Sequence, residues 1–347
     1  MGDWVTDPVT GHRPTQGERH RSIVDSAVAA EDGGFDAFHI GEHHFCEYIV
    51  SSPAVVLGAV AARTTRLRLS NGVALAANLD PVRICEDYAT VDALSDGRVE
   101  PCFGRGTFFP GVFSNFGQHE SDAAERFAES IELICRLWTE EGVTWSGRFR
   151  PDLAAVTVQP RPGQQPRPPI WLGAGTSKAS VDLAARLGLR LMLPTVFGTP
   201  EMFAPMVQRY IRKWEEFGHD PADRRIGCVS HAHVGRHHEA TRSAWEPRYL
   251  AYFEAVLRWQ RQSAEAAGVE FGAFPLADFD TMCSTIAVCG SVDHVLERMA
   301  HIADILSIDT HLLMLDLGGL PHDELIDQID QFGAEVLPSL PTPARTG

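Results

Sequence analysis

GFDAFHIGEHHF, residues 34–45, joins a short apolar run to a cluster of polar side chains, and this junction decides the fold. Residues 35–41 have the length and apolar content of a buried strand. A helical stripe over residues 19–32 precedes the strand and stops at two glycines, which commonly end helices. A helix therefore leads into a buried strand that carries polar side chains at its carboxyl end. These are Glu42, His43 and His44.

The same alternation of helix and strand recurs along the rest of the chain. Apolar runs predict seven strands, over residues 35–41, 67–75, 99–105, 170–173, 189–194, 226–234 and 311–317. Such alternation builds either a closed barrel or a doubly wound open sheet. Polar residues follow several different strands, which is typical of an active site at one end of a barrel. The sequence therefore predicts an α/β fold, a (β/α)8 TIM barrel with insertions.

Length and charge limit the roles that the chain can have. Its 347 residues suit one barrel domain over 1–347, and weak periodicity at 258–284 suggests either a mobile lid or an ordinary helix and loop. The net charge of -16 disfavours nucleic acid as a partner. We expect a cytoplasmic protein with no membrane contact, because no apolar run could span a bilayer and no signal segment is recognisable. Its scattered cysteines predict reduced thiols.

The histidines after the first strand point to proton transfer. An imidazole exchanges protons near neutral pH, and a neighbouring carboxylate such as Glu42 can fix the tautomer of His43. A structural role for these side chains is the alternative. We predict no metal site, because His43 and His44 are consecutive at a strand end and point in different directions.

Two further motifs favour anion binding. Arg105 lies between two glycines at the end of a predicted strand, where its guanidinium can meet an anion at close range. The turn GAGTSKAS, residues 173–180, presents backbone N–H groups and hydroxyls at the start of a helix, as phosphate-binding turns do. Simple helix capping by Thr176 or Ser177 is the alternative for this turn.

The order of these motifs resembles the bacterial luciferase-like monooxygenase family. The segments that carry the resemblance are 34–45, 51–73, 80–100, 104–109 and 169–180. The resemblance implies a TIM barrel, usually dimeric, that binds FMN or the deazaflavin F420 at the carboxyl ends of its strands. It further implies a flavin-dependent monooxygenase that uses O2 and reduced FMN from a separate flavin reductase to oxygenate a small organic substrate. An F420-dependent dehydrogenase or a non-catalytic flavoprotein subunit are the alternatives.

The resemblance also assigns residues. His43 matches the family's catalytic histidine, with Glu42 orienting it, and a cis peptide bond is expected at Gly72–Val73. Arg105 and Arg126 match arginines that contact phosphate. The remaining cofactor-binding residues implied are Gly72, Val73, Gly175, Thr176, Ser177 and Ser180. For the walls of an apolar substrate pocket we predict Phe45, Tyr48, Phe108, Phe109 and His231.

The sequence departs from the family pattern in two places. The family opens with a strand, whereas here a turn follows residues 2–5, so we expect the first strand to be truncated or missing. An open barrel would expose strand edges. Pro101 falls inside the predicted strand 99–105 and removes a donor from its ladder, so we also expect a bulge there.

Overall fold

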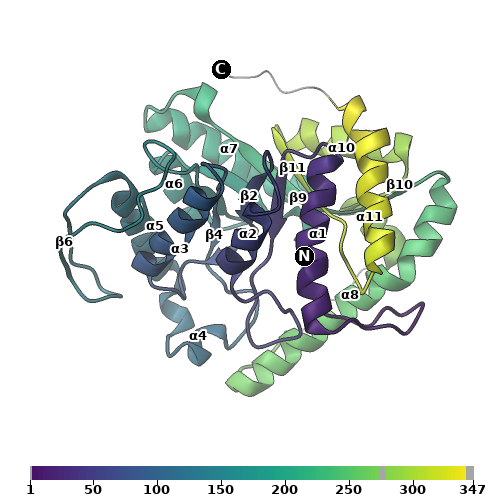
Figure 1. The fold of residues 1–347 in the computed structure, drawn as a ribbon, viewed down its shortest axis with the longest axis horizontal. Helices are drawn as coiled ribbons and strands as arrows, with labels where there is room; N and C mark the ends of the chain where they lie inside the picture. Colours follow the sequence, from purple (N-terminus) through teal and green to yellow (C-terminus); the bar gives the residue numbers. More distant parts are fainter. Residues whose placement is uncertain (1, 273–277, 341–347) are drawn as a thin grey trace.

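A computed structural model describes residues 2–272 and 278–340 of the chain. In Figure 1, helices surround a central group of parallel strands. The strands are β1 Ala37–Ile40, β2 Arg68–Asn71, β3 Ala74–Leu75, β4 Cys102–Gly104, β5 Val143–Trp145, β6 Leu153–Val156, β7 Trp171–Gly173, β8 Arg190–Leu193, β9 Ile226–Gly235, β10 Ala287–Ser291 and β11 Thr310–Met314. The α-helices are α1 Gln16–Asp32, α2 Pro53–Ala61, α3 Pro81–Leu94, α4 Val112–Asn115, α5 Ala123–Thr139, α6 Lys178–Arg186, α7 Pro200–Glu216, α8 His238–Ala267, α9 Phe279–Thr285, α10 Val292–Leu306 and α11 His322–Gln331.

Local signals in the sequence set where the helices begin and which face they bury. Thr15 caps α1 in a capping box with Glu18, and Asp80 caps α3 just before a proline at its first turn. In the sequence, Phe127, Ile131 and Trp138 recur at the spacing of one face of a helix over residues 121–139, and in α5 this face is buried. The helices predicted from periodicity are therefore confirmed.

The strands form a parallel sheet that curves around an apolar interior. The order is β3-β4-β7-β8-β9, and both β10 and β11 pair with β9. Side chains from six different places along this sheet form one inner cluster, as the side chains inside a barrel do. The inner cluster consists of Val73, Cys102, Trp171, Met192, Val229 and Leu312. The fold is thus the predicted α/β fold of the (β/α)8 barrel type.

The described residues contain no strand before α1. β1 pairs with β2 alone and β11 with β9 alone, and the segment before α1 adds one isolated bridge, from Asp3 to Tyr48. Helices α1 and α11 pack against each other, and they lie side by side in Figure 1. Arg19 on α1 bonds both Asp3, at 3.0 Å, and Asp316, which follows β11, at 2.7 Å. A buried ion network thus links the segment before α1, helix α1 itself and the segment after β11. The first strand expected to be missing would precede α1.

Pro101 breaks the strand predicted over residues 99–105. Val99 makes an isolated bridge to Leu69, and regular pairing of β4 starts only at Cys102. Between β2 and β4 the side chain of Asn71 takes the place of the ladder, since its amide donates to the carbonyl of Cys102 and its Oδ1 accepts from the N–H of Cys102. The expected irregularity is present, although a side chain fills it rather than a bulge.

Three strands of the described residues were not predicted from the sequence. The antiparallel β5–β6 pair leaves the barrel after α5, and β10 adds to the carboxyl half of β9. Residues 258–267 of the predicted lid form the end of the long helix α8. The last residues of the predicted lid lie in α9. Residues 273–277 of that segment lie outside the described residues, so its mobility stays a prediction.

Candidate active site

His43 lies just beyond the carboxyl end of β1, among aromatic side chains. Its ring centroid is 4.5 Å from that of Tyr48, 4.8 Å from that of Phe109 and 5.9 Å from that of Phe108. The ring of Phe108 in turn lies 4.9 Å from Phe197, which follows β8. Three of the predicted pocket residues therefore do gather around His43, and the rings form an apolar enclosure for its imidazole.

This enclosure decides the charge of His43. Burial of the imidazole lowers the pKa of His43 to about 3. The ring is therefore neutral at physiological pH, with one nitrogen as donor and the other as acceptor. It can hydrogen-bond a ligand on both sides without bringing a charge into the enclosure.

Glu42 is directed at His44 and not at His43. Its Oε1 is 2.7 Å from Nε2 of His44, and its Oε2 accepts a hydrogen bond of 3.2 Å from the N–H of Leu75. The prediction that Glu42 orients His43 is therefore wrong. Consecutive side chains at a strand end diverge, so His43 meets the aromatic rings while His44 turns toward the carboxylate. Glu42 is buried, and it ties the end of β1 to β3.

The ends of three strands come close together around Val73. The Gly72–Val73 peptide bond is cis, as expected. A Cβ added to Gly173 would lie 2.8 Å from Cγ1 of Val73, and one added to Gly104 would overlap its Cγ2. Larger residues do not fit at either glycine, because the side chain of Val73 lies directly against the backbone of β4 and β7 at this level of the barrel.

The turn between β7 and α6 contains both hydroxyls and free N–H groups. Ser177 caps α6, accepting from the N–H of Ser180 at 3.4 Å, and Oγ of Ser180 donates to Oγ of Ser177 at 3.2 Å. Thr176 is exposed, and a Cβ on Gly175 would lie 3.3 Å from Pro194. Capping and anion binding use the same first turn of the helix, so the turn can serve both.

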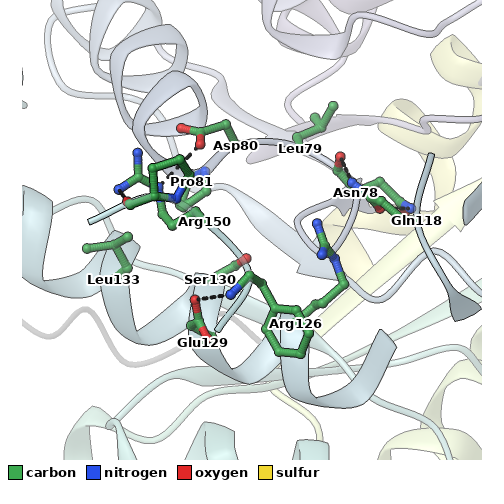
Figure 2. Close-up of a pocket in the computed structure, with 12 residues that line it drawn as sticks. Asn78, Leu79, Asp80, Pro81, Gln118, Arg126, Glu129, Ser130, Leu133 and Arg150 are labelled. Atoms are coloured by element: carbon green, nitrogen blue, oxygen red, sulfur yellow. Dashed lines mark hydrogen bonds and ion pairs between the residues drawn. The ribbon is translucent and has the colours of Figure 1, made fainter. Parts of the chain in front are cut away.

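The two predicted phosphate-binding arginines come from different elements. Arg105 follows β4 and is half-buried. Arg126 on α5 donates from Nε to the carbonyl of Ala77 at 3.1 Å. Figure 2 shows Arg126 at a cavity of about 220 Å³, with its guanidinium pointing toward the loops that carry Asn78 and Gln118. Arg126 therefore offers its remaining N–H groups to a ligand near the β3–α3 connection.

His231 lies in a second aromatic group. It is on β9, where its Nδ1 is 3.1 Å from the hydroxyl of Tyr249. The rings of Tyr249, Tyr252 and Phe253 on α8 stand edge-on to it, with centroids 5.4 to 5.5 Å away. Burial lowers the pKa of His231 to about 3, and its buried Nε2 has no hydrogen-bond partner within the described residues.

Like His231, Phe45 is a predicted pocket residue that does not join the enclosure around His43. Its side chain is 58% exposed, and its ring faces His44 and Phe116 at 5.8 and 5.4 Å. Sequence reasoning also missed Phe197, which packs against Phe108. The sequence contained one signal for it, since Phe197 follows the end of a predicted strand as the other site residues do.

Asn78 was missed as well. Its Nδ2 donates to Gln118 at 3.1 Å, whereas its buried Oδ1 has no hydrogen-bond partner in the described part of the chain. A Cβ on Gly106 would lie 2.6 Å from this Oδ1, so Asn78 connects the loop after β4 to the cavity at Arg126.

The described ranges contain no group of three or more possible metal ligands, and none of their helices could cross a membrane.

Comparisons with known proteins agree with this arrangement. The family model for luciferase-like monooxygenases matches residues 2–307. The crystal structure of the monooxygenase RslO1 from Streptomyces bottropensis is 26% identical, with a TM-score of 0.84 over 96% of this chain and 97% of that one. The oxygenase component of the flavin-dependent trigonelline monooxygenase of Acinetobacter baylyi is 23% identical over 334 residues, 94% of this chain and 91% of the relative.

A third relative uses another cofactor. The F420-dependent glucose-6-phosphate dehydrogenase of Nakamurella multipartita is 36% identical over 177 residues, which cover 48% of this chain and 49% of the relative. The family model spans most of the chain, and this confirms the resemblance inferred from the motifs. The chain belongs to the luciferase-like monooxygenase family and is a flavin-dependent oxidoreductase.

Proposed function

We propose that the chain is a monooxygenase that uses reduced FMN and O2 to oxygenate a small organic substrate. The observation that carries the proposal is the neutral His43 inside its ring of Tyr48, Phe108 and Phe109, at the carboxyl ends of the strands. An apolar enclosure keeps water away from a reacting oxygen species. Two relatives that cover more than nine tenths of the chain are monooxygenases by name.

The residues at the strand ends fit a phosphorylated flavin. Ser177, Ser180 and the N–H groups at the start of α6 would hold the phosphate, aided by the helix dipole. Arg105 and Arg126 would add positive charge with forked donors. Val73, packed against the two glycines, would offer its apolar side chain to the flat ring. When bound, the reduced flavin supplies the electrons that activate O2.

His43 would act through hydrogen bonds in its neutral form. It can accept a proton at one nitrogen while it gives up a proton from the other, which moves a proton without leaving a charge behind. F420-dependent dehydrogenation is the second candidate, favoured by the F420-dependent relative. There His43 would have to keep the proton released during hydride transfer. Burial opposes a charged imidazole, which favours the monooxygenase.

The supply of reduced flavin is a further part of the proposal. We infer that a separate reductase delivers it, because the Acinetobacter relative is named as the oxygenase component of its enzyme. A homodimer is expected from the resemblance to the family. Mixing the purified chain with a general flavin reductase, NADH, FMN and a substrate should then form oxygenated product, which the same mixture without the chain should not form.

Anaerobic titration with reduced FMN, reduced F420 and reduced riboflavin tests the cofactor. We expect FMN to bind best, and Ser177→Ala combined with Ser180→Ala to weaken FMN about tenfold or more while leaving riboflavin almost unchanged. Equal losses for FMN and riboflavin would place the phosphate elsewhere. Binding of reduced F420 alone would favour the dehydrogenase instead.

A second experiment tests His43. With a panel of small ketones and aromatic compounds, His43→Ala should lose product formation but keep its affinity for FMN, whereas the exposed control His12→Ala should behave like the wild type. Unchanged product formation in His43→Ala would reject the role of this residue.

A further inference from the structure

Two cysteines outside the site already described lie in contact beside β9. Cys283 is in α9 and Cys289 is in β10, and their side chains are only 3% and 1% exposed. Only Ile286 separates α9 from β10, and both thiols lie in the same cluster of packed side chains. Both pack in a small apolar cluster that also contains Tyr249 and Met314.

A cation faces one member of this pair. Arg242 on α8 forms an ion pair with Asp280, which lies in the same helix as Cys283, and its positive charge acts on the thiol of Cys283. Its buried Nε has no hydrogen-bond partner in the described ranges. The hydrogen bond from Cys289 and the charge of Arg242 lower the pKa of Cys283, and the same contact raises the pKa of Cys289. Thus Cys283 is the member that reaches the thiolate form, and Cys289 keeps its proton.

The other cysteines of the chain are in a different situation. Burial raises the pKa of Cys102, and it raises the pKa of Cys228 and Cys46 to about 12 and about 11. A buried thiol that keeps its proton reacts slowly with oxidants, because the thiolate is the nucleophile. Reactivity toward an oxidant is therefore expected at the Cys283 and Cys289 pair before these three.

We propose that Cys283 and Cys289 are an oxidative modification site, a dithiol that a hydroperoxide converts to an intramolecular disulfide. The thiolate of Cys283 attacks one oxygen of hydrogen peroxide, the O–O bond breaks, and a sulfenic acid and one water form. The thiol of Cys289 then attacks this sulfur, the S–O bond breaks, and a second water leaves as the S–S bond forms. Both sulfurs are oxidised and both peroxide oxygens are reduced.

The position of the pair gives this reaction a structural consequence. A disulfide would fasten α9 to β10 next to Tyr249, whose hydroxyl contacts Nδ1 of His231. The bond would therefore form in the wall behind His231. The proposal needs no flavin and stands independently of the function proposed above.

The sequence makes the test simple. Trypsin cleaves after Arg261 and Arg298, and the peptide 262–298 contains both cysteines and no other. The folded chain is treated with hydrogen peroxide, denatured, alkylated and digested. We expect this peptide to lose two hydrogen atoms and to escape alkylation, and to take up two alkyl groups once it has been reduced. Peptide 99–105, which contains Cys102, should stay fully alkylated in the same sample.

Variants separate the steps of the reaction. Cys283→Ser should leave Cys289 alkylated, and Cys289→Ser should leave a sulfenic acid on Cys283 that a dione reagent traps. Arg242→Gln should slow disulfide formation, whereas the matched control Arg258→Gln, which removes an exposed arginine of the same helix, should not.

The unmodified chain alone can overturn the proposal, even if a variant fails to fold. Peptide 262–298 that remains alkylated at both cysteines while peptide 99–105 is oxidised would reject the site. Oxygen atoms added to either sulfur in place of hydrogen loss, or a disulfide that links two chains on a non-reducing gel, would also reject it.

Discussion

Desolvated neutral histidines should make the folded chain sensitive to acid, and the half-buried His311 gives the clearest test. It lies on β11 with Nε2 2.9 Å from Oγ of Ser230, and burial lowers its pKa from 6.5 to about 4. The folded state therefore binds fewer protons than the unfolded state. Stability then rises with pH, and it is lost as the pH falls from 6.5 toward 4.

The magnitude follows from the two pKa values. Between pH 7 and pH 5, His311 should remove about 2 kcal/mol from the free energy of unfolding, because the unfolded imidazole becomes protonated while the folded one stays mostly neutral. Burial lowers the pKa of further histidines in the same way. The free energy of unfolding that all of them together remove on acidification therefore approaches the roughly 5–15 kcal/mol that stabilises a typical domain. These are His39, His43, His231 and His233. We expect cooperative acid unfolding near pH 5.

Urea unfolding of three proteins at pH 7 and at pH 5 provides the assay. His311→Gln keeps a polar group near Ser230 but cannot be protonated, so acidification should cost this variant about 2 kcal/mol less than the wild type. His12→Gln changes an exposed histidine and should follow the wild type. An equal loss in His311→Gln and the wild type would refute the reasoning, whatever the absolute stability of the variant.

Two predictions concern packing and charge. Gly104→Ala should lower the melting temperature, because the added Cβ overlaps Val73. Gly58→Ala has open space at the Cβ in helix α2 and should raise the stability by about 0.5–1 kcal/mol. Calorimetry that ranks the two variants the other way would contradict the packing. Arg19→Met should lower the free energy of unfolding in urea by about 3–5 kcal/mol, because it removes the charge partner of two buried aspartates. Arg83→Met on the surface should lower it by less than about 1 kcal/mol. Similar losses in the two variants would show that the buried network is not needed.

Short-range signals in the sequence were enough for most elements. The spacing of apolar residues predicted α1 and α5, because a helix depends on contacts three and four residues apart. The polar residues at several strand ends indicated a barrel and one shared site, and the family motifs added the cis bond at Gly72–Val73. None of these inferences needed knowledge of distant contacts.

Partners between distant residues could not be predicted in the same way. Nothing in residues 42–44 shows that the carboxylate of Glu42 turns to His44 and to the N–H of Leu75, because this depends on how β3 lies beside the end of β1. Similarly, the contact of His231 with Tyr249 depends on where α8 crosses β9. The spacing in the sequence does not fix either arrangement.

The sequence by itself therefore determined the fold class, the order of the elements and the motifs at the strand ends, since these are properties of neighbouring residues. The tertiary structure alone decided which rings enclose His43, and through them its neutral charge, because desolvation depends on every group packed around the imidazole. It likewise brought Cys283 and Cys289 together with Arg242, three side chains from three different elements.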